Sequence, residues 1–308
     1  MAWAVGIALG GTNVRAGAVA EDGGIAGFVI EPVDRQTDGE GLASLLAKLV
    51  ADVRGDKLVV AVGAALPATL RAPDGEILPG TSNLPGLEGF PILKRMQELT
   101  GLRCAIGNDA DLALWGEARY GAARHARNAV AITLGTGIGS GLMLDGRLWS
   151  GSRGHGAELG LTRVPEPSSA SGRSWIALET LASAEALRNL TGSAAEQVYA
   201  SAKRGDRKSQ ALIEAVCEYL AIAIANAHLL LDLEVAVLCG GMAKAGAVLL
   251  DGVKRQFEAL CPPPYRDGLT IALGELGDRA AVAGAASLAF GLTPVTIGKI
   301  GSGRPKPS

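Results

Sequence analysis

The chain opens on an apolar run of strand length that leads directly into residues 10–13, GGTN, after which strand-like sequence resumes. A second copy of this pattern lies at residues 129–144, AVAITLGTGIGSGLML, where the apolar and glycine positions match those of residues 4–19. Each copy runs on to an Asp-Gly pair, at residues 22–23 and 145–146, which is typical of a hairpin turn. The repeat predicts two lobes of related design.

The rest of the pattern alternates strand-like and helical segments, which favours an α/β fold. The pattern predicts strands at 25–30, 58–64, 103–106, 147–149 and 235–238, and helices at 40–53, 88–100 and 279–290. After residue 180 the sequence is rich in helical patterns up to the strand at 235. We expect a smaller lobe at 1–114, a larger lobe at 115–290, and a loosely ordered tail at 291–308.

Composition and charge restrict the class of function. With 308 residues, of which 48% are hydrophobic and 19% charged, the chain has enough apolar sequence for a large core. The balance of 29 basic and 31 acidic residues gives no basic excess for nucleic acid or an anionic membrane. The longest apolar stretch, 220–238, is interrupted by polar residues, and the N-terminus lacks the basic region of a signal peptide. We expect a cytoplasmic protein that binds a small molecule, with no nucleic-acid or membrane partner.

The cysteines and histidines are too dispersed to predict a disulfide framework or a metal site. No C-x-x-C pair occurs in the sequence, and a lone histidine is far more often a core or surface residue than a ligand. The residues concerned are Cys104, Cys217, Cys239, Cys261, His125, His155 and His228. We therefore predict no metal held by protein ligands.

The two glycine turns are candidates for binding a polyanion. A single turn of this kind is equally typical of a tight hairpin that needs positive φ. Two such turns, one in each lobe, favour a different function, in which backbone N–H groups and the hydroxyls of Thr12 and Thr136 face one phosphate chain. A Rossmann site is disfavoured because the first turn reads G-G-T and is not followed by a helix, and no G-x-x-x-x-G-K-[ST] loop occurs.

A second group of polar residues follows the predicted strand at 103–106. Asn108 is placed as the N-cap of a helix and Asp109 as its first residue, and a capped helix start alone accounts for both. The helix dipole also keeps the Asp109 carboxylate ionised, so that it is able to accept a proton from a hydroxyl group. Asp111 points elsewhere, and we assign it no role.

Six motifs resemble those of one family and occur in that family's order. They are GGTN, PGTSNLPGLEGFP, GNDADLALWGE, LGTGIGSG, GHGAELG and VLCGGM. Together, from about residue 4 to residue 290, they resemble the ROK-family sugar kinases of the sugar kinase, actin and Hsp70 superfamily. The resemblance implies an actin-like, ribonuclease H-like α/β fold with two lobes around a cleft. It also implies transfer of the γ-phosphate of ATP to a hexose hydroxyl.

The resemblance assigns roles to the residues that match the family's motifs. Asp109 matches the catalytic base. The implied substrate-binding residues are Asn83, Asn108, Asp109, Glu158 and Glu179. The implied nucleotide-binding residues are Gly10, Gly11, Thr12, Asn13, Gly135, Thr136, Gly137, Gly240 and Gly241. Mg²⁺ bridges the ATP phosphates in this chemistry, and a homodimer is expected because dimers are usual among the relatives.

The chain also departs from the family at several positions. Ala8 stands where the first turn usually carries an acid, and Leu161 replaces a histidine that contacts sugar and binds zinc. Residues 168–178 replace the cysteine-rich zinc segment, so no structural zinc is expected. The sugar loop Gly-x-Pro-Gly reads ALPA at residues 65–68. No helix-turn-helix precedes the first strand, which disfavours DNA binding.

The motifs predict an ATP-dependent, glucokinase-like kinase for a hexose or a hexose derivative, without zinc. The alternative from another class is a non-catalytic sensor of the same fold that binds sugar or nucleotide. The presence of Asp109 argues against that alternative. Nucleotide turnover without a sugar is a third and weaker hypothesis.

Overall fold

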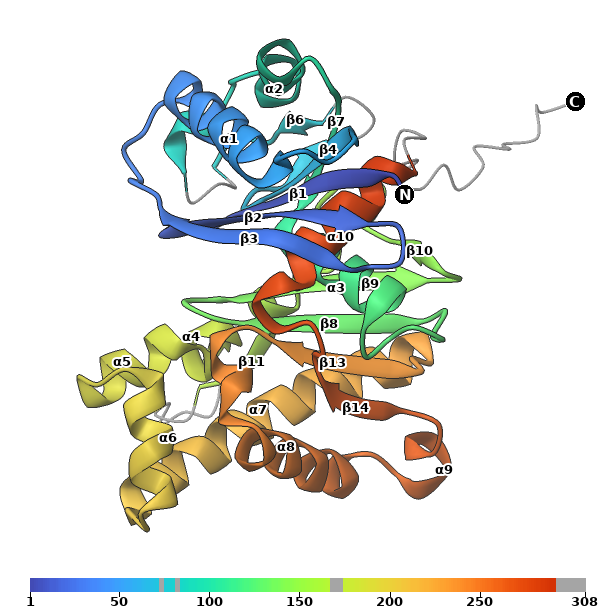
Figure 1. Cartoon of the computed structure of the whole chain (residues 1–308). Helices are drawn as coiled ribbons and strands as arrows, with labels where there is room; N and C mark the ends of the chain where they lie inside the picture. Colours follow the sequence, from blue (N-terminus) through green and yellow to red (C-terminus); the bar gives the residue numbers. More distant parts are fainter. Residues whose placement is uncertain (72–74, 81–83, 167–173, 292–308) are drawn as a thin grey trace, which may run out of the picture. The chain divides into compact units, whose positions relative to one another are not determined.

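The structure, a computed structural model, describes residues 1–71, 75–80, 84–166 and 174–291 (Figure 1). The strands are β1 (Trp3–Leu9), β2 (Asn13–Ala20), β3 (Ile25–Pro32), β4 (Val59–Leu66), β5 (Leu70–Arg71), β6 (Glu76–Ile77), β7 (Arg103–Asn108), β8 (Ala129–Leu134), β9 (Ile138–Leu144), β10 (Arg147–Leu148), β11 (Arg163–Pro165), β12 (Trp175–Ala177), β13 (Val235–Cys239) and β14 (Thr270–Leu273). The α-helices are α1 (Gly39–Arg54), α2 (Ile92–Thr100), α3 (Asp109–Tyr120), α4 (Glu179–Ala182), α5 (Ala184–Thr191), α6 (Ala195–Lys203), α7 (Arg207–Leu231), α8 (Ala247–Leu260), α9 (Pro263–Arg266) and α10 (Ala280–Phe290). Short 3₁₀ helices are η1 (Pro85–Leu87), η2 (Leu159–Leu161), η3 (Gly241–Ala245) and η4 (Gly277–Arg279).

The two main sheets have the same strand order, which confirms the repeat predicted from the sequence. One sheet has the order β3-β2-β1-β4-β7 and the other the order β10-β9-β8-β13-β14. In each, the glycine turn joins the two antiparallel strands of a hairpin, and parallel strands extend the sheet on the other side. The alternation of these strands with helices confirms the predicted α/β class (Figure 1).

The predicted helix at 88–100 is shorter than expected. Helix α2 begins at Ile92, and the segment before it forms η1 at Pro85–Leu87. Pro91 occupies the N-cap position, and a proline disfavours helical backbone at the residue before it. The helical pattern therefore cannot extend back through Phe90. The other predicted strands and helices correspond to observed elements.

By its contacts the chain divides into two compact units. Unit 1 comprises Met1–Asp109, Leu148–Ala157 and the end of α10 from Ala285, and unit 2 comprises Ala110–Arg147 and Glu158–Gly284. Both units are built from segments that are not continuous in the sequence. The predicted lobe boundary at residue 114, and the assignment of each lobe to one continuous stretch, stay predictions.

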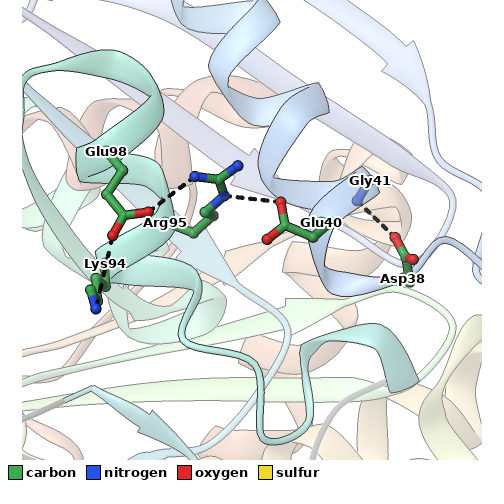
Figure 2. Close-up of polar contacts among 6 residues, drawn as sticks. All are labelled: Asp38, Glu40, Gly41, Lys94, Arg95 and Glu98. Carbon is green, nitrogen blue, oxygen red and sulfur yellow. Dashed lines mark hydrogen bonds and ion pairs between the residues drawn. The ribbon is translucent and has the colours of Figure 1, made fainter.

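Helices α1 and α2 cover one face of the sheet in unit 1. Helix α1 begins after Asp38, whose Oδ1 accepts a hydrogen bond from the Gly41 N–H at 2.8 Å (Figure 2). Its buried residues follow helical spacing, and among them Leu42, Leu46 and Leu49 are fully buried. On the surface, Arg95 of α2 bonds Glu40 of α1 at 2.9 Å (Figure 2). Exposed ion pairs contribute little, so apolar packing provides most of the stability of this layer.

Helix α7 is the central helix of unit 2. By length and composition alone it is apolar enough to cross a membrane, yet half of its most apolar 18-residue segment is buried inside the fold. It packs against α8, α6 and α4. Its first turn is capped by Asp206, whose carboxylate accepts from the Ser209 N–H at 2.8 Å. A core helix of a globular unit has these properties.

A buried carboxylate fixes the ends of two elements in unit 2. Glu117 of α3 is fully buried. Its carboxylate oxygens accept hydrogen bonds from the N–H groups of Ala122 at 2.8 Å, Glu275 at 3.1 Å and Leu276 at 3.0 Å. These donors lie after α3 and after β14, so one side chain ties both turns to the helix.

Replacing Glu117 by glutamine should therefore destabilise the protein. The amide retains one acceptor oxygen and places an NH₂ group against backbone donors, which leaves buried N–H groups without acceptors. We expect Glu117→Gln to lower the free energy of unfolding by about 2–3 kcal/mol in chemical denaturation. The control Glu218→Gln, on an exposed position of α7, should change it by less than about 0.5 kcal/mol. Equal effects of the two variants would contradict this role of Glu117.

Candidate active site

The predicted functional residues gather at the carboxyl ends of parallel strands. In unit 1, β1, β4 and β7 are parallel neighbours. Strand β1 leads into the first glycine turn, β4 ends within the segment at 65–68, and β7 ends at Asn108, directly before Asp109. In unit 2, β8 and β13 are parallel, and they lead into the second glycine turn and Gly240–Gly241. The carboxyl ends of parallel strands are where open α/β sheets bind ligands.

The first glycine turn uses its leading N–H internally and leaves the next two available. The Gly10 N–H donates to the Asn13 carbonyl at 2.9 Å, which closes the turn. The Val33 N–H donates to the Thr12 carbonyl at 2.9 Å, which fixes the turn to the segment after β3. Within the described part of the chain, the N–H groups of Gly11 and Thr12 donate to no other protein group.

The second glycine turn repeats this arrangement. The Gly135 N–H donates to the Gly137 carbonyl at 3.0 Å, and the Ala184 N–H donates to the Gly135 carbonyl at 2.9 Å. Among the residues that the structure describes, the N–H groups of Thr136 and Gly137 have no protein acceptor. Each turn thus presents two adjacent backbone donors, which is the arrangement that binds phosphate groups.

The third glycine segment lies beside the second turn. Gly240 follows β13 with φ of 86°, and a Cβ atom there would lie 2.6 Å from the Leu134 carbonyl oxygen. Only glycine fits this close approach to the end of β8. Burial, together with the nearby Glu117 carboxylate, raises the pKa of the preceding Cys239 to about 12. The thiol is therefore neutral at neutral pH and is not a nucleophile.

Glu179 lies on the second glycine turn. It is the first residue of α4, and its Oε2 accepts a hydrogen bond from the Ile138 N–H at 3.2 Å. A Cβ atom at Gly137 would lie 2.6 Å from the same oxygen. The structure therefore brings a predicted substrate-binding carboxylate together with predicted nucleotide-binding residues. This is the proximity that transfer of a phosphoryl group from nucleotide to substrate requires.

The segment around Glu158 packs against the beginning of β9. The Leu159 N–H donates to Ser140 Oγ at 2.8 Å. A Cβ atom at Gly160 would lie only 2.1 Å from the Ile138 carbonyl oxygen, so the backbone of η2 lies directly against β9. Glu158 and Glu179 are thus both held next to the beginning of β9. Leu161, which stands in place of the family's histidine, is 55% exposed within the fold.

Asn108 and Asp109 occupy the junction of β7 and α3. The strand extends two residues beyond the predicted 103–106, to Asn108, and the helix begins at Asp109, as the sequence predicts. The side-chain amide of Asn108 donates to the Ala68 carbonyl at 3.2 Å. This bond ties the helix start to the segment at 65–68, whose first two residues end β4 and which the resemblance matches to the family's sugar loop. The predicted substrate residue Asn83 lies outside the described residues.

The protein residues at the first turn do not suit a magnesium ion. Ala8 is buried in β1, where its register partner in β2 is Arg15, so a methyl group stands at the position that carries an acid in the family's motif. Magnesium prefers carboxylate and water oxygens, and we therefore treat Mg²⁺ as part of the MgATP substrate. In the described ranges, no group of three or more His, Cys, Asp or Glu side chains is placed to hold a metal. The absence of zinc stays a prediction, because residues 167–173 of the replaced zinc segment lie outside the described residues.

The comparison with known proteins decides the family. The model of the ROK family matches residues 4–291. The chain belongs to the ROK family. This ROK protein is 29% identical to a glucokinase of Halalkalibacterium halodurans over 92% of this chain and 93% of the relative. It is 31% identical to an N-acetylmannosamine kinase of Citrobacter koseri over 92% of this chain and 98% of the relative.

The fold of this ROK protein matches a solved structure of a family member. A glucokinase from Streptomyces griseus, in complex with glucose and AMPPNP, superposes with a TM-score of 0.81 at 25% identity. The match covers 94% of this chain and 99% of the other. This similarity confirms the actin-like two-lobe class that the motifs imply.

Ala157 has strained backbone next to a predicted substrate-binding residue. Its φ is 65°, a left-handed conformation that a non-glycine residue rarely adopts, and Glu158 follows it directly. A Cβ atom in this region costs roughly 1–2 kcal/mol. The position of Glu158 therefore depends on a backbone conformation that the alanine side chain opposes.

Glycine at position 157 should relieve this strain. We expect Ala157→Gly to raise the free energy of unfolding by up to about 1 kcal/mol, since part of the relief is offset by the added freedom of the unfolded chain. The control Ala51→Gly, at an exposed position in helix α1, should lower it by about 1 kcal/mol. A loss of stability in both variants by the same amount would show that Ala157 is not strained.

Proposed function

We propose that this ROK protein is an ATP-dependent sugar kinase that transfers the γ-phosphate of ATP to a hydroxyl group of a hexose or a hexose derivative. The observation that carries the proposal is the position of Asp109. It begins α3 at the carboxyl ends of the parallel strands, at the same end of the sheet as the first glycine turn. It is also next to Asn108, whose side chain bonds the segment at 65–68. The names of the relatives, glucokinase and N-acetylmannosamine kinase, support the same class of reaction.

In this mechanism the protein binds the negatively charged phosphates of ATP and positions the reacting hydroxyl. The two pairs of backbone N–H groups, at Gly11–Thr12 and Thr136–Gly137, donate to phosphate oxygens. Asp109 accepts the proton of the sugar hydroxyl as its oxygen bonds to the γ-phosphorus, and the bond from that phosphorus to the β-phosphate oxygen breaks. The products are a sugar phosphate and ADP. Catalysis of this class is mainly positioning and stabilisation of charge.

Three further side chains hold the sugar in this proposal. Asn108, Glu158 and Glu179 carry amide and carboxylate groups, which donate to and accept from several hydroxyls at once. Glu179 is also next to the second glycine turn, where the transferred phosphate would be bound. Action in the cytoplasm and a homodimeric assembly remain predictions.

The role of Asp109 is tested by removing its charge. We expect Asp109→Asn to retain the fold and most of the sugar affinity, while phosphoryl transfer falls by roughly 10²-fold or more, the range for loss of a general base. The measurement is release of ADP, coupled to a reporter reaction, across a panel of hexoses, amino sugars and polyols. Asp111→Asn, two residues further along the same helix, is the matched control and should retain the rate.

Two results would contradict the proposal. Unchanged turnover in Asp109→Asn would show that another group takes the proton. If the native protein binds sugar in calorimetry and yet phosphorylates no member of the panel, the protein is a sensor and not a kinase.

The missing acid at position 8 predicts a slow enzyme. Without it, nucleotide binding is retained by the backbone donors, but less of the charge on the transferred phosphate is neutralised. We expect Ala8→Asp to raise kcat by about one to two orders of magnitude, which corresponds to about 1.4–3 kcal/mol, and to lower the Mg²⁺ concentration for half-maximal rate. Ala8→Asn is the uncharged control of similar size. Brisk turnover of the native protein, unaltered by Ala8→Asp, would rule out this explanation.

A further inference from the structure

The guanidinium group of Arg35 lies on the first glycine turn. Its Nε donates a hydrogen bond to the Gly11 carbonyl at 2.9 Å. Its Nη2 lies 3.3 Å from the place that a Cβ atom on Gly11 would occupy, so the group covers the side of Gly11 that lacks a side chain. A cation therefore lies within contact distance of the residue whose N–H is available to a phosphate.

The backbone that carries Arg35 is anchored on both sides. Before it, the Val33 N–H donates to the Thr12 carbonyl at 2.9 Å. Directly around it, Asp34 closes a local turn by accepting from the Gln36 N–H at 2.9 Å. After it, Asp38 caps helix α1 (Figure 2). Arg35 is thus presented to the glycine turn by a fixed segment of unit 1.

Most of the donors of the Arg35 guanidinium are not used. A guanidinium has five N–H donors, and in the described structure the bond to Gly11 is the one that Arg35 makes. No carboxylate pairs with it among the described residues. Five other arginines do pair with a carboxylate: Arg95, Arg124, Arg127, Arg188 and Arg255.

We propose that Arg35 binds a phosphate of the nucleotide at the first glycine turn and supplies positive charge there, where Ala8 provides no ligand for a metal. The proposal rests on the proposed kinase function. The Nε bond to the Gly11 carbonyl orients the guanidinium, and its terminal nitrogens donate to the same phosphate group as the Gly11 and Thr12 N–H groups. Arginine is suited to this role because its planar donors match phosphate oxygens in pairs.

Nucleotide binding without magnesium tests the proposal directly. The native protein is titrated with ATP, ADP and AMP in the presence of EDTA, and binding is measured by calorimetry. These titrations report binding without any catalytic step. Arg35→Ala should weaken ATP binding by roughly 10-fold or more, as for loss of a charged hydrogen bond. The salt dependence of ATP binding should fall with it. The control Arg54→Ala removes a charge at the end of α1 and should leave the affinity unchanged.

A lysine at position 35 separates contact with phosphate from support of the turn. Arg35→Lys keeps the charge but loses the planar Nε bond to Gly11 and the paired donors, so it should recover part of the ATP affinity and most of its salt dependence. Equal loss in Arg35→Lys and Arg35→Ala would mean that Arg35 only supports the turn, and the proposal would be wrong. Native affinity in Arg35→Ala would also overturn it. If the native protein phosphorylates sugar in either of these cases, the kinase function stands, whereas a native protein that binds no nucleotide refutes both.

Discussion

The hydrogen bond that closes each glycine turn is the interaction on which the site depends. In both turns the first glycine donates its N–H within the turn, to Asn13 in one and to Gly137 in the other. That bond fixes the backbone so that the next two N–H groups, in the described structure, remain without a protein acceptor. Donors that are already held in position stabilise an anion without the cost of reorienting them. The duplicated sheets repeat this device, one in each unit.

The parallel strands next to each turn place the acids and amides of the candidate site. In unit 1, β7 places Asn108 and Asp109 at the carboxyl ends of the parallel strands, the end of the sheet at which the first turn also lies. In unit 2, Ile138 connects the elements, because its N–H contacts Glu179 and its carbonyl lies against Gly160 beside Glu158. The candidate phosphate donors of the backbone and the candidate hydroxyl acceptors of the side chains therefore occur together within a unit. A kinase needs both types of group near the bond that breaks.

The pattern of apolar residues predicted the sheets well because strands and hairpin turns depend on local sequence. The Asp145–Gly146 turn is an example, since both residues have positive φ, as a two-residue hairpin requires. Long-range polar contacts were not predictable. Arg35 lies 24 residues from Gly11, and no spacing rule connects a polar loop residue to a turn on another strand. Glu117 was missed for a related reason, because a charged residue in a helix is normally exposed and its three backbone acceptor contacts form only in the folded unit.

Amide hydrogen exchange in the presence of a non-hydrolysable ATP analogue tests the central claim, that the unused N–H groups of the glycine turns bind the phosphates. The Gly10 and Gly135 amides should be protected before the nucleotide is added, because they are bonded within their turns. The amides of Gly11, Thr12, Thr136 and Gly137 should become protected only when it binds. Saturating nucleotide that leaves the exchange of those four amides unchanged would contradict the account.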